Sequence, residues 1–159
     1  MRRWGPAAKA LSLVIVALLL SGACIGEDGA TFRNPILPAA ADPWVFRHTD
    51  GFYYLCGSAH EEIFLLRSRT LTGLAAGERK VIRHRQPTGS SSRQIWAPEL
   101  HWLDGAWYVY FAASDGDNRN HRMSVVANPS PDPFDGTFVE KGRLATPDDD
   151  AWAIDGSIL

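Results

Sequence analysis

The chain has 159 residues, of which 45% are hydrophobic, 11% aromatic and 21% charged. This composition excludes an intrinsically disordered protein and predicts a folded domain with a hydrophobic core. The formal net charge of −2 excludes a basic surface that neutralises phosphates, so we expect no nucleic-acid partner. Six Trp, four Tyr and seven Phe residues suit a core, and they also suit a sugar-binding surface, because a sugar's C–H face stacks on a ring.

The N-terminal segment, over residues 1–23, has the pattern of a secretory signal. Arg2, Arg3 and Lys9 precede an apolar run over residues 10–20. That run is too short to cross a bilayer of about 30 Å as a helix. Small residues follow at positions 21–23, as at a signal-peptidase site. We therefore expect an extracellular protein, with residues 1–23 as the signal and residues 24–32 as a linker.

Cys24 directly follows the small residues, as in bacterial lipoprotein signals, but Ser21 stands where those signals usually carry Leu. Plain secretion and lipid attachment at Cys24, on the outer face of a bacterial membrane, both stay open. A lipid anchor is the only membrane contact we expect. The second cysteine, Cys56, lies in an apolar stretch and is expected to be a small buried side chain.

From residue 33 onward the chain consists of strand and turn patterns. Runs of aromatic and β-branched residues flank Asp50-Gly51 and, again, Asp104-Gly105. An Asp-Gly pair between two such runs is typical of a β-hairpin. The two hairpins resemble each other, and a third copy begins at residue 153. We therefore expect an all-β fold built from repeats.

The repeat length predicts a β-propeller. The sequence interval from Asp42 to Glu99 is almost equal to the interval from Glu99 to Asp155, and each leaves room for a four-stranded blade. A β-sandwich is the competing architecture, but it does not predict an acidic residue at the same point of each repeat. The expected strands are residues 44–46, 52–56, 63–68 and 79–84 in the first repeat, and 100–103, 107–112, 123–126 and 138–141 in the second.

The three repeated acids predict a chemical site. The first strand of a propeller blade lines the central axis, so Asp42, Glu99 and Asp155 are expected to converge at one mouth of the channel. Carboxylates gathered in one cleft push their pKa values apart, so that one is a base while another holds a proton. A Trp lies within three residues of each acid. Glycoside hydrolysis needs paired carboxyl groups, and aromatic walls would hold the sugar.

Five motifs follow one another over residues 33 to 159. They are Asn34-Pro35-Ile36-Leu37, Ala41-Asp42-Pro43-Trp44-Val45, Ile95-Trp96-Ala97-Pro98-Glu99-Leu100-His101, Trp107-Tyr108-Val109-Tyr110-Phe111 and Trp152-Ala153-Ile154-Asp155-Gly156. In their order and spacing, these motifs resemble glycoside hydrolase family 43. The stretch His121-Arg122-Met123, with Asp132-Pro133-Phe134 and Gly136 downstream, resembles arabinofuranosidase-type members of that family.

The resemblance implies a five-bladed β-propeller, of which this chain would hold about two blades and the first strand of a third. It also implies an inverting mechanism in which Asp42 is the general base and Asp155 modulates the pKa of the general acid. The family's general acid is a Glu on the blade after Asp155. The chain is therefore expected to be a fragment without that Glu, inactive by itself.

The substrate implied is an arabinose-containing plant polysaccharide or oligosaccharide, cleaved by an α-L-arabinofuranosidase; β-xylosidase and endo-arabinanase are neighbouring specificities. Trp44, Trp96 and Glu99 are the candidate sugar-binding residues, although Trp96 also fits core packing and Glu99 a structural carboxylate. A propeller that binds sugar without cleaving it, or an inactive truncated remnant, is the alternative. No cofactor is expected, and an axial metal ion would belong to the complete propeller.

Overall fold

The computed structural model of the chain describes residues 34–38, 41–145 and 150–158. These residues belong to one compact unit that spans residues 33–159. The expected signal over residues 1–23, the linker over residues 24–32 and the lipid-attachment residue Cys24 lie outside the described residues. Within the described ranges, no helix is both long and apolar enough to span a membrane.

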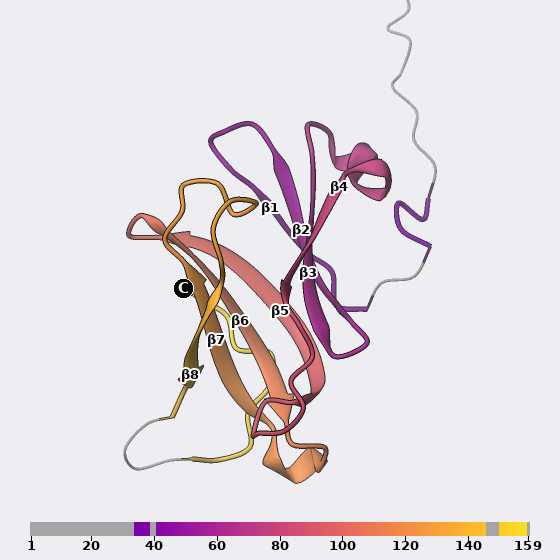
Figure 1. Cartoon of the computed structure of the whole chain (residues 1–159). Helices are drawn as coiled ribbons and strands as arrows, with labels where there is room; N and C mark the ends of the chain where they lie inside the picture. The colour runs from indigo at the N-terminus through magenta and orange to yellow at the C-terminus, as the bar shows by residue number, and fades with distance from the viewer. Residues whose placement is uncertain (1–33, 39–40, 146–149, 159) are drawn as a thin grey trace, which may run out of the picture. The chain divides into compact units, whose positions relative to one another are not determined.

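The described residues form two four-stranded antiparallel sheets, each with its strands in chain order (Figure 1). Two short 3-10 helices, η1 and η2, join strands within the sheets. The elements are β1 (Trp44–Arg47), β2 (Tyr53–Ala59), β3 (Glu62–Ser68), η1 (Leu71–Ala76) and β4 (Glu78–Arg83) in the first sheet, and β5 (Arg93–Leu103), β6 (Ala106–Ser114), η2 (Asn118–Asn120), β7 (Arg122–Asn128) and β8 (Val139–Arg143) in the second.

The first hairpin of each sheet turns at its Asp-Gly pair, as the sequence predicts. Gly51 and Gly105 have φ angles of +84° and +81°, in the left-handed region that glycine adopts without a Cβ penalty. In the first hairpin the Asp50 carboxylate accepts a hydrogen bond from the Phe52 amide at 2.8 Å, which fixes the turn locally.

The main hydrophobic core lies between the two sheets. Tyr54 of β2 and Trp107 of β6 are fully buried, with ring centroids 5.3 Å apart. Full burial of a large apolar side chain contributes about 1.5–3 kcal/mol, so these contacts stabilise the packing of one sheet on the other. The buried members of this core are Tyr54, Cys56, Ile63, Leu65, Ile82, Ile95, Leu100, Trp107, Val109, Phe111, Ala113, Val126 and Phe138.

The prediction of propeller blades is confirmed: eight strands are found where eight were expected, and each repeat forms its own sheet. The main difference is β5, which begins at Arg93 rather than near Leu100. Its pairing with β6 shifts register twice, between Arg93 and Trp96 and between Trp96 and Glu99. Pro98, which has no N–H to donate, lies within the second shift, where the regular pairing is interrupted.

Residues 150–158, expected to begin a third blade, run without strand pairing in the described structure. A strand is defined by backbone pairing with a neighbour, and the described residues hold no third sheet. This segment is attached to the second blade by a backbone hydrogen bond from Ala153 N to His121 O at 3.1 Å.

Candidate active site

The three acids predicted from the repeat line one pocket of about 280 Å³. Asp42 lies two residues before β1, Glu99 lies in β5, and Asp155 lies in the segment that follows the second blade. The convergence inferred from the blade period is therefore what the structure shows. The complete lining is Asp42, Pro43, Trp44, Ala97, Glu99 and Asp155.

Left-handed backbone brings three of these residues to the pocket. The φ angles are 45° at Asp42, 41° at Ala97 and 53° at Asp155. Asp adopts this region more readily than most residues, whereas Ala rarely does, so Ala97 holds its conformation against a backbone penalty. Such conformations persist only where the surroundings fix them.

Trp44 ties the first strands of the two blades together. Its indole Nε1 donates a hydrogen bond to Leu100 O at 2.8 Å, across 56 positions of sequence. Its ring packs against His101 with the centroids 5.0 Å apart. Trp44, which the sequence predicts to bind sugar, therefore lines the pocket. Its hydrogen bond also fixes the spacing between β1, which follows Asp42, and β5, which carries Glu99.

Glu99 is mostly buried and has a specific partner. Its Oε2 lies 3.1 Å from Nε2 of His101, and the two side chains are 17% and 11% exposed. The sulfur of Cys56 is buried nearby: burial, and then the negative charge of Glu99, raise the pKa of this thiol well above its usual value. The sequence leaves two roles open for Glu99, a structural carboxylate and a sugar-binding residue. The side chain has a hydrogen-bonding partner in His101, and it also lines the pocket.

Trp96 is placed differently from the other candidates. It is absent from the pocket lining and 36% exposed, and its ring stacks on His121 with centroids 3.9 Å apart and planes 24° from parallel. His121 is completely buried. The sequence marked His121 only as part of a motif, and it missed the pocket-lining residues Pro43 and Ala97, which neighbour the predicted acids and tryptophans.

The part of the chain that the structure describes contains no set of side chains arranged to bind a metal ion. No group of three or more His, Cys, Asp or Glu side chains there is placed to hold a metal ion. The expectation of an axial metal ion concerns the complete propeller, and no ligand for it is assigned among the described residues.

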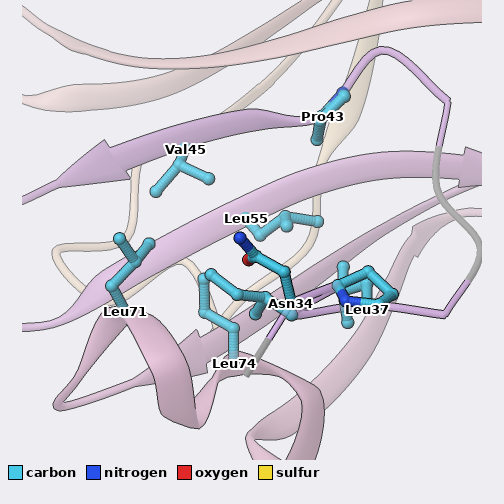
Figure 2. Close-up of a pocket in the computed structure, with 9 residues that line it drawn as sticks. Asn34, Leu37, Pro43, Val45, Leu55, Leu71 and Leu74 are labelled. Carbon is cyan, nitrogen blue, oxygen red and sulfur yellow. The ribbon is translucent and has the colours of Figure 1, made fainter. Parts of the chain in front are cut away.

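A larger pocket of about 550 Å³ lies on the first blade and is apolar (Figure 2). Its side chains include Leu55 of β2 and Leu74 of η1, together with the motif at residues 34–37. None of the lining residues carries a titratable side chain, so this pocket lacks the groups for acid–base chemistry. The lining is Asn34, Pro35, Ile36, Leu37, Pro43, Val45, Leu55, Leu71 and Leu74.

Sequence similarity to known proteins indicates the family of this chain. The sequence model described as "Glycosyl hydrolases family 43" matches residues 32–159. An extracellular exo-alpha-(1->5)-L-arabinofuranosidase of Streptomyces chartreusis is 47% identical over 120 residues, which cover 74% of this chain and 37% of that protein. A protein of the same name from Streptomyces avermitilis is 39% identical over 141 residues, covering 87% of this chain and 29% of its own length.

A solved structure agrees with the sequence relatives. The crystal structure of an alpha-L-arabinofuranosidase from Lactobacillus brevis is 38% identical and superposes with a TM-score of 0.73, covering 80% of this chain and 43% of that one. The chain thus spans about a third of the length of the two Streptomyces relatives and less than half of the Lactobacillus one.

Proposed function

Because the chain belongs to glycosyl hydrolases family 43, we propose that the complete protein is an α-L-arabinofuranosidase that cleaves arabinose-containing polysaccharide or oligosaccharide with inversion. The observation that carries this proposal is the convergence of Asp42, Glu99 and Asp155 on one pocket. The names of the relatives, which specify arabinofuranosidase activity, support arabinose as the sugar.

The proposed mechanism gives each carboxyl group one role. An inverting enzyme uses one carboxylate to activate water and one carboxylic acid to protonate the leaving oxygen, about 6.5–9.5 Å apart. We assign the base to Asp42 and the pKa-modulating charge to Asp155, because a nearby negative charge helps an acid keep its proton. The acid is assigned to a Glu of the following blade, in the part of the relatives' length that this chain does not span.

Glu99 and Trp44 are proposed to bind the sugar. Glu99 is held by His101, so its carboxylate is oriented before substrate arrives. A preoriented acceptor gains affinity because less side-chain freedom is lost on binding. Trp44 adds an aromatic wall, while Trp96, outside the pocket lining, is proposed to act through its contact with His121.

The Asp42→Asn variant of the full-length gene product tests the proposal. Asn keeps the shape of the side chain but cannot take a proton from water, so kcat for an aryl arabinofuranoside is expected to fall about 10²- to 10⁴-fold. Sugar binding, measured by calorimetry, is expected to stay within about threefold. Asp104→Asn, at an exposed hairpin turn, is the matched control with unchanged kcat.

The outcomes separate the alternatives. Near-normal turnover by Asp42→Asn would remove Asp42 from the mechanism. An unmodified full-length protein that binds arabino-oligosaccharide but never cleaves it would establish the sugar-binding alternative instead.

Export is also part of the proposal. We propose that residues 1–23 direct secretion, and the word "extracellular" in the names of two relatives supports it. A Cys24→Ser variant distinguishes the two forms of export. Transfer of the protein from the membrane fraction to the medium would demonstrate a lipid anchor at Cys24, and unchanged release would demonstrate plain secretion.

A further inference from the structure

The motif His121-Arg122-Met123 contacts the segment that carries Asp155 through all three of its residues. This motif begins at the residue before β7 and resembles arabinofuranosidase-type relatives, but the roles proposed above use only the contact of His121 with Trp96. The segment it meets, residues 150–156, ends beside the pocket.

The first two contacts are polar. The carbonyl oxygen of His121 accepts the Ala153 amide at 3.1 Å, two positions before Asp155. The guanidinium of Arg122 donates from Nε to Oδ1 of Asp150 at 2.9 Å, and the Arg122 side chain is only 17% exposed. The segment is therefore held at two points before it reaches the pocket.

The third contact is a close approach between Gly156 and Met123. A Cβ at Gly156 would lie 3.1 Å from both Cγ and Cε of Met123, tighter than ordinary van der Waals contact. Met123 is 7% exposed, and its backbone is paired with β6. The residue directly after Asp155 therefore rests on the motif.

The motif is itself anchored to β5, the strand that carries Glu99. The Nδ1 and Nε2 atoms of His121 each lie 3.1 Å from a backbone carbonyl oxygen, that of Asn118 and that of Gln94 respectively. The Trp96 ring stacks on the His121 ring. From Gln94 and Trp96, β5 continues to Ala97 and Glu99 in the pocket lining.

The indole of Trp152 adds a link from the segment itself. Its Nε1 donates to Asn118 O at 2.8 Å, the same oxygen that lies near His121 Nδ1. One carbonyl group of η2 thus connects the His121 ring to the segment three residues before Asp155.

We propose that His121-Arg122-Met123 is a positioning device that sets the carboxyl of Asp155 relative to Glu99 in the pocket. This inference rests on the proposed function, because it explains how the modulating acid is held in place. Asp155 has left-handed backbone, with a φ of 53°, and a residue in that region keeps its conformation only if its surroundings impose it. The motif supplies those surroundings.

The decisive variant is His121→Phe in the full-length gene product. Phe keeps a ring against Trp96 but removes both ring nitrogens that face the carbonyl groups of Asn118 and Gln94. We expect kcat to fall about 10- to 100-fold, because a displacement of about 1 Å at a catalytic group costs that much, with KM changed less than about threefold. His48→Phe is the matched control: His48 also packs among aromatic rings, 4.7 Å from Trp107, and should leave kcat unchanged.

The pH profile separates positioning from general destabilisation. Asp42 and Glu99 share the pocket with Asp155. In the proposed mechanism, the negative charge of Asp155 raises the pKa of the general acid. Moving Asp155 away lowers that pKa, so the alkaline limb of kcat/KM in His121→Phe is expected to move to lower pH. An unshifted limb would overturn the proposal, since loss of stability alone changes no pKa in the folded enzyme.

A second variant covers the case in which His121→Phe does not fold. Gly156→Ala places a methyl group against Met123 and should shift the alkaline limb in the same direction. Adding Met123→Ala removes the atoms that the methyl group meets, so the limb should return toward its original position. No return in the double variant would contradict the role of Met123.

Hydrogen exchange tests this inference independently of the proposed function. The Ala153 amide, bonded to His121 O, is expected to exchange at least about tenfold faster in His121→Phe and at the original rate in His48→Phe. If the unmodified protein cleaves no arabinoside but Ala153 responds in this way, the proposed function fails and the positioning device stands. Unchanged exchange in both variants overturns the device.

Discussion

Left-handed backbone at the pocket is the feature that most constrains single residues. Asp42 and Ala97 each precede a proline and Asp155 precedes a glycine, and all three have φ angles between 41° and 53°. In the two blades, the chain makes this unusual turn just before β1 and within β5, and Asp155 makes it in the segment that follows the second blade. The turn explains why side chains a whole repeat apart in the sequence reach one pocket.

Substitutions at Ala97 test this strain. Val, branched at Cβ, is expected to lower the free energy of unfolding by about 1–3 kcal/mol, because the left-handed region excludes it more strongly than Ala. Ala97→Gly is the matched control: relief of strain and the entropic cost of glycine, each about 1 kcal/mol or less, nearly cancel. Urea denaturation of the full-length gene product measures both. Equal stability of the two variants would show that Ala97 is unstrained.

The sequence predicts the three acids of the pocket, but not the contacts around them. The nearly constant spacing of Asp42, Glu99 and Asp155 can be seen in the sequence itself. If each repeat forms a propeller blade, this spacing predicts that the three carboxyl groups converge. The stacking of Trp96 on His121 joins two residues that share no period, so only the folded arrangement reveals it. The left-handed angle at Ala97 has no sequence signal either, because Ala rarely adopts it.

At the scale of elements, two positively charged side chains of the first sheet hold a loop of the second sheet. The Lys80 ammonium of β4 lies 2.9 Å from both Phe134 O and Gly136 O, in the connection between β7 and β8. Arg67 of β3 pairs with Asp132 of the same connection at 2.6 Å. Hydrogen bonds to charged groups stabilise more than neutral ones, so this loop is a main joint between the blades.

The Arg67–Asp132 pair predicts a pH dependence of stability. Burial acts to raise the pKa of Asp132, but hydrogen bonds from the Phe134 amide and from Arg67, with the charge of Arg67, lower it overall. The unfolded chain therefore binds the proton more readily than the folded one. The contribution is complete above the ordinary Asp pKa of about 3.9 and is lost as the pH falls through the lowered folded value.

Thermal melts between about pH 6 and pH 3 measure this contribution. Asp132→Asn is expected to melt lower than the unmodified protein at pH 6, and to lose less of its melting temperature on acidification. Asp104→Asn, in an exposed turn, should follow the unmodified protein throughout. Parallel curves for Asp132→Asn and the unmodified protein would refute the assignment.

Strand positions are predicted well where alternation and Asp-Gly turns mark them, as in β2 and β6. The extent of β5 is not predicted, because its first half contains two register shifts, left-handed residues at Gln94 and Ala97, and a proline. Each of these normally ends a strand. Here the pairing with β6 resumes after each irregularity, and that continuation depends on tertiary contacts.

At the scale of the whole molecule, two blades leave apolar surface uncovered. In the larger pocket on the first blade, Val45 and Leu71 are 40% and 41% exposed (Figure 2). Beside the second blade, Leu144 and Trp152 are 49% and 48% exposed. Apolar side chains gathered in this way favour association with another surface.

Residues 24–159 produced alone are therefore expected to self-associate or to unfold without a sharp transition. Light scattering after size-exclusion chromatography, together with a thermal melt, measures both properties. A monomer with a sharp cooperative melt would contradict the expectation and would show that two blades suffice for a stable unit.

The burial of Cys56 gives the molecule a built-in probe of its own opening. This thiol lies in the core between the blades, and its raised pKa keeps it protonated and unreactive in the folded state. A thiol reagent therefore reaches Cys56 only while the core around it is open. The labelling rate, followed with increasing reagent, reports how often that opening occurs, without any engineered label.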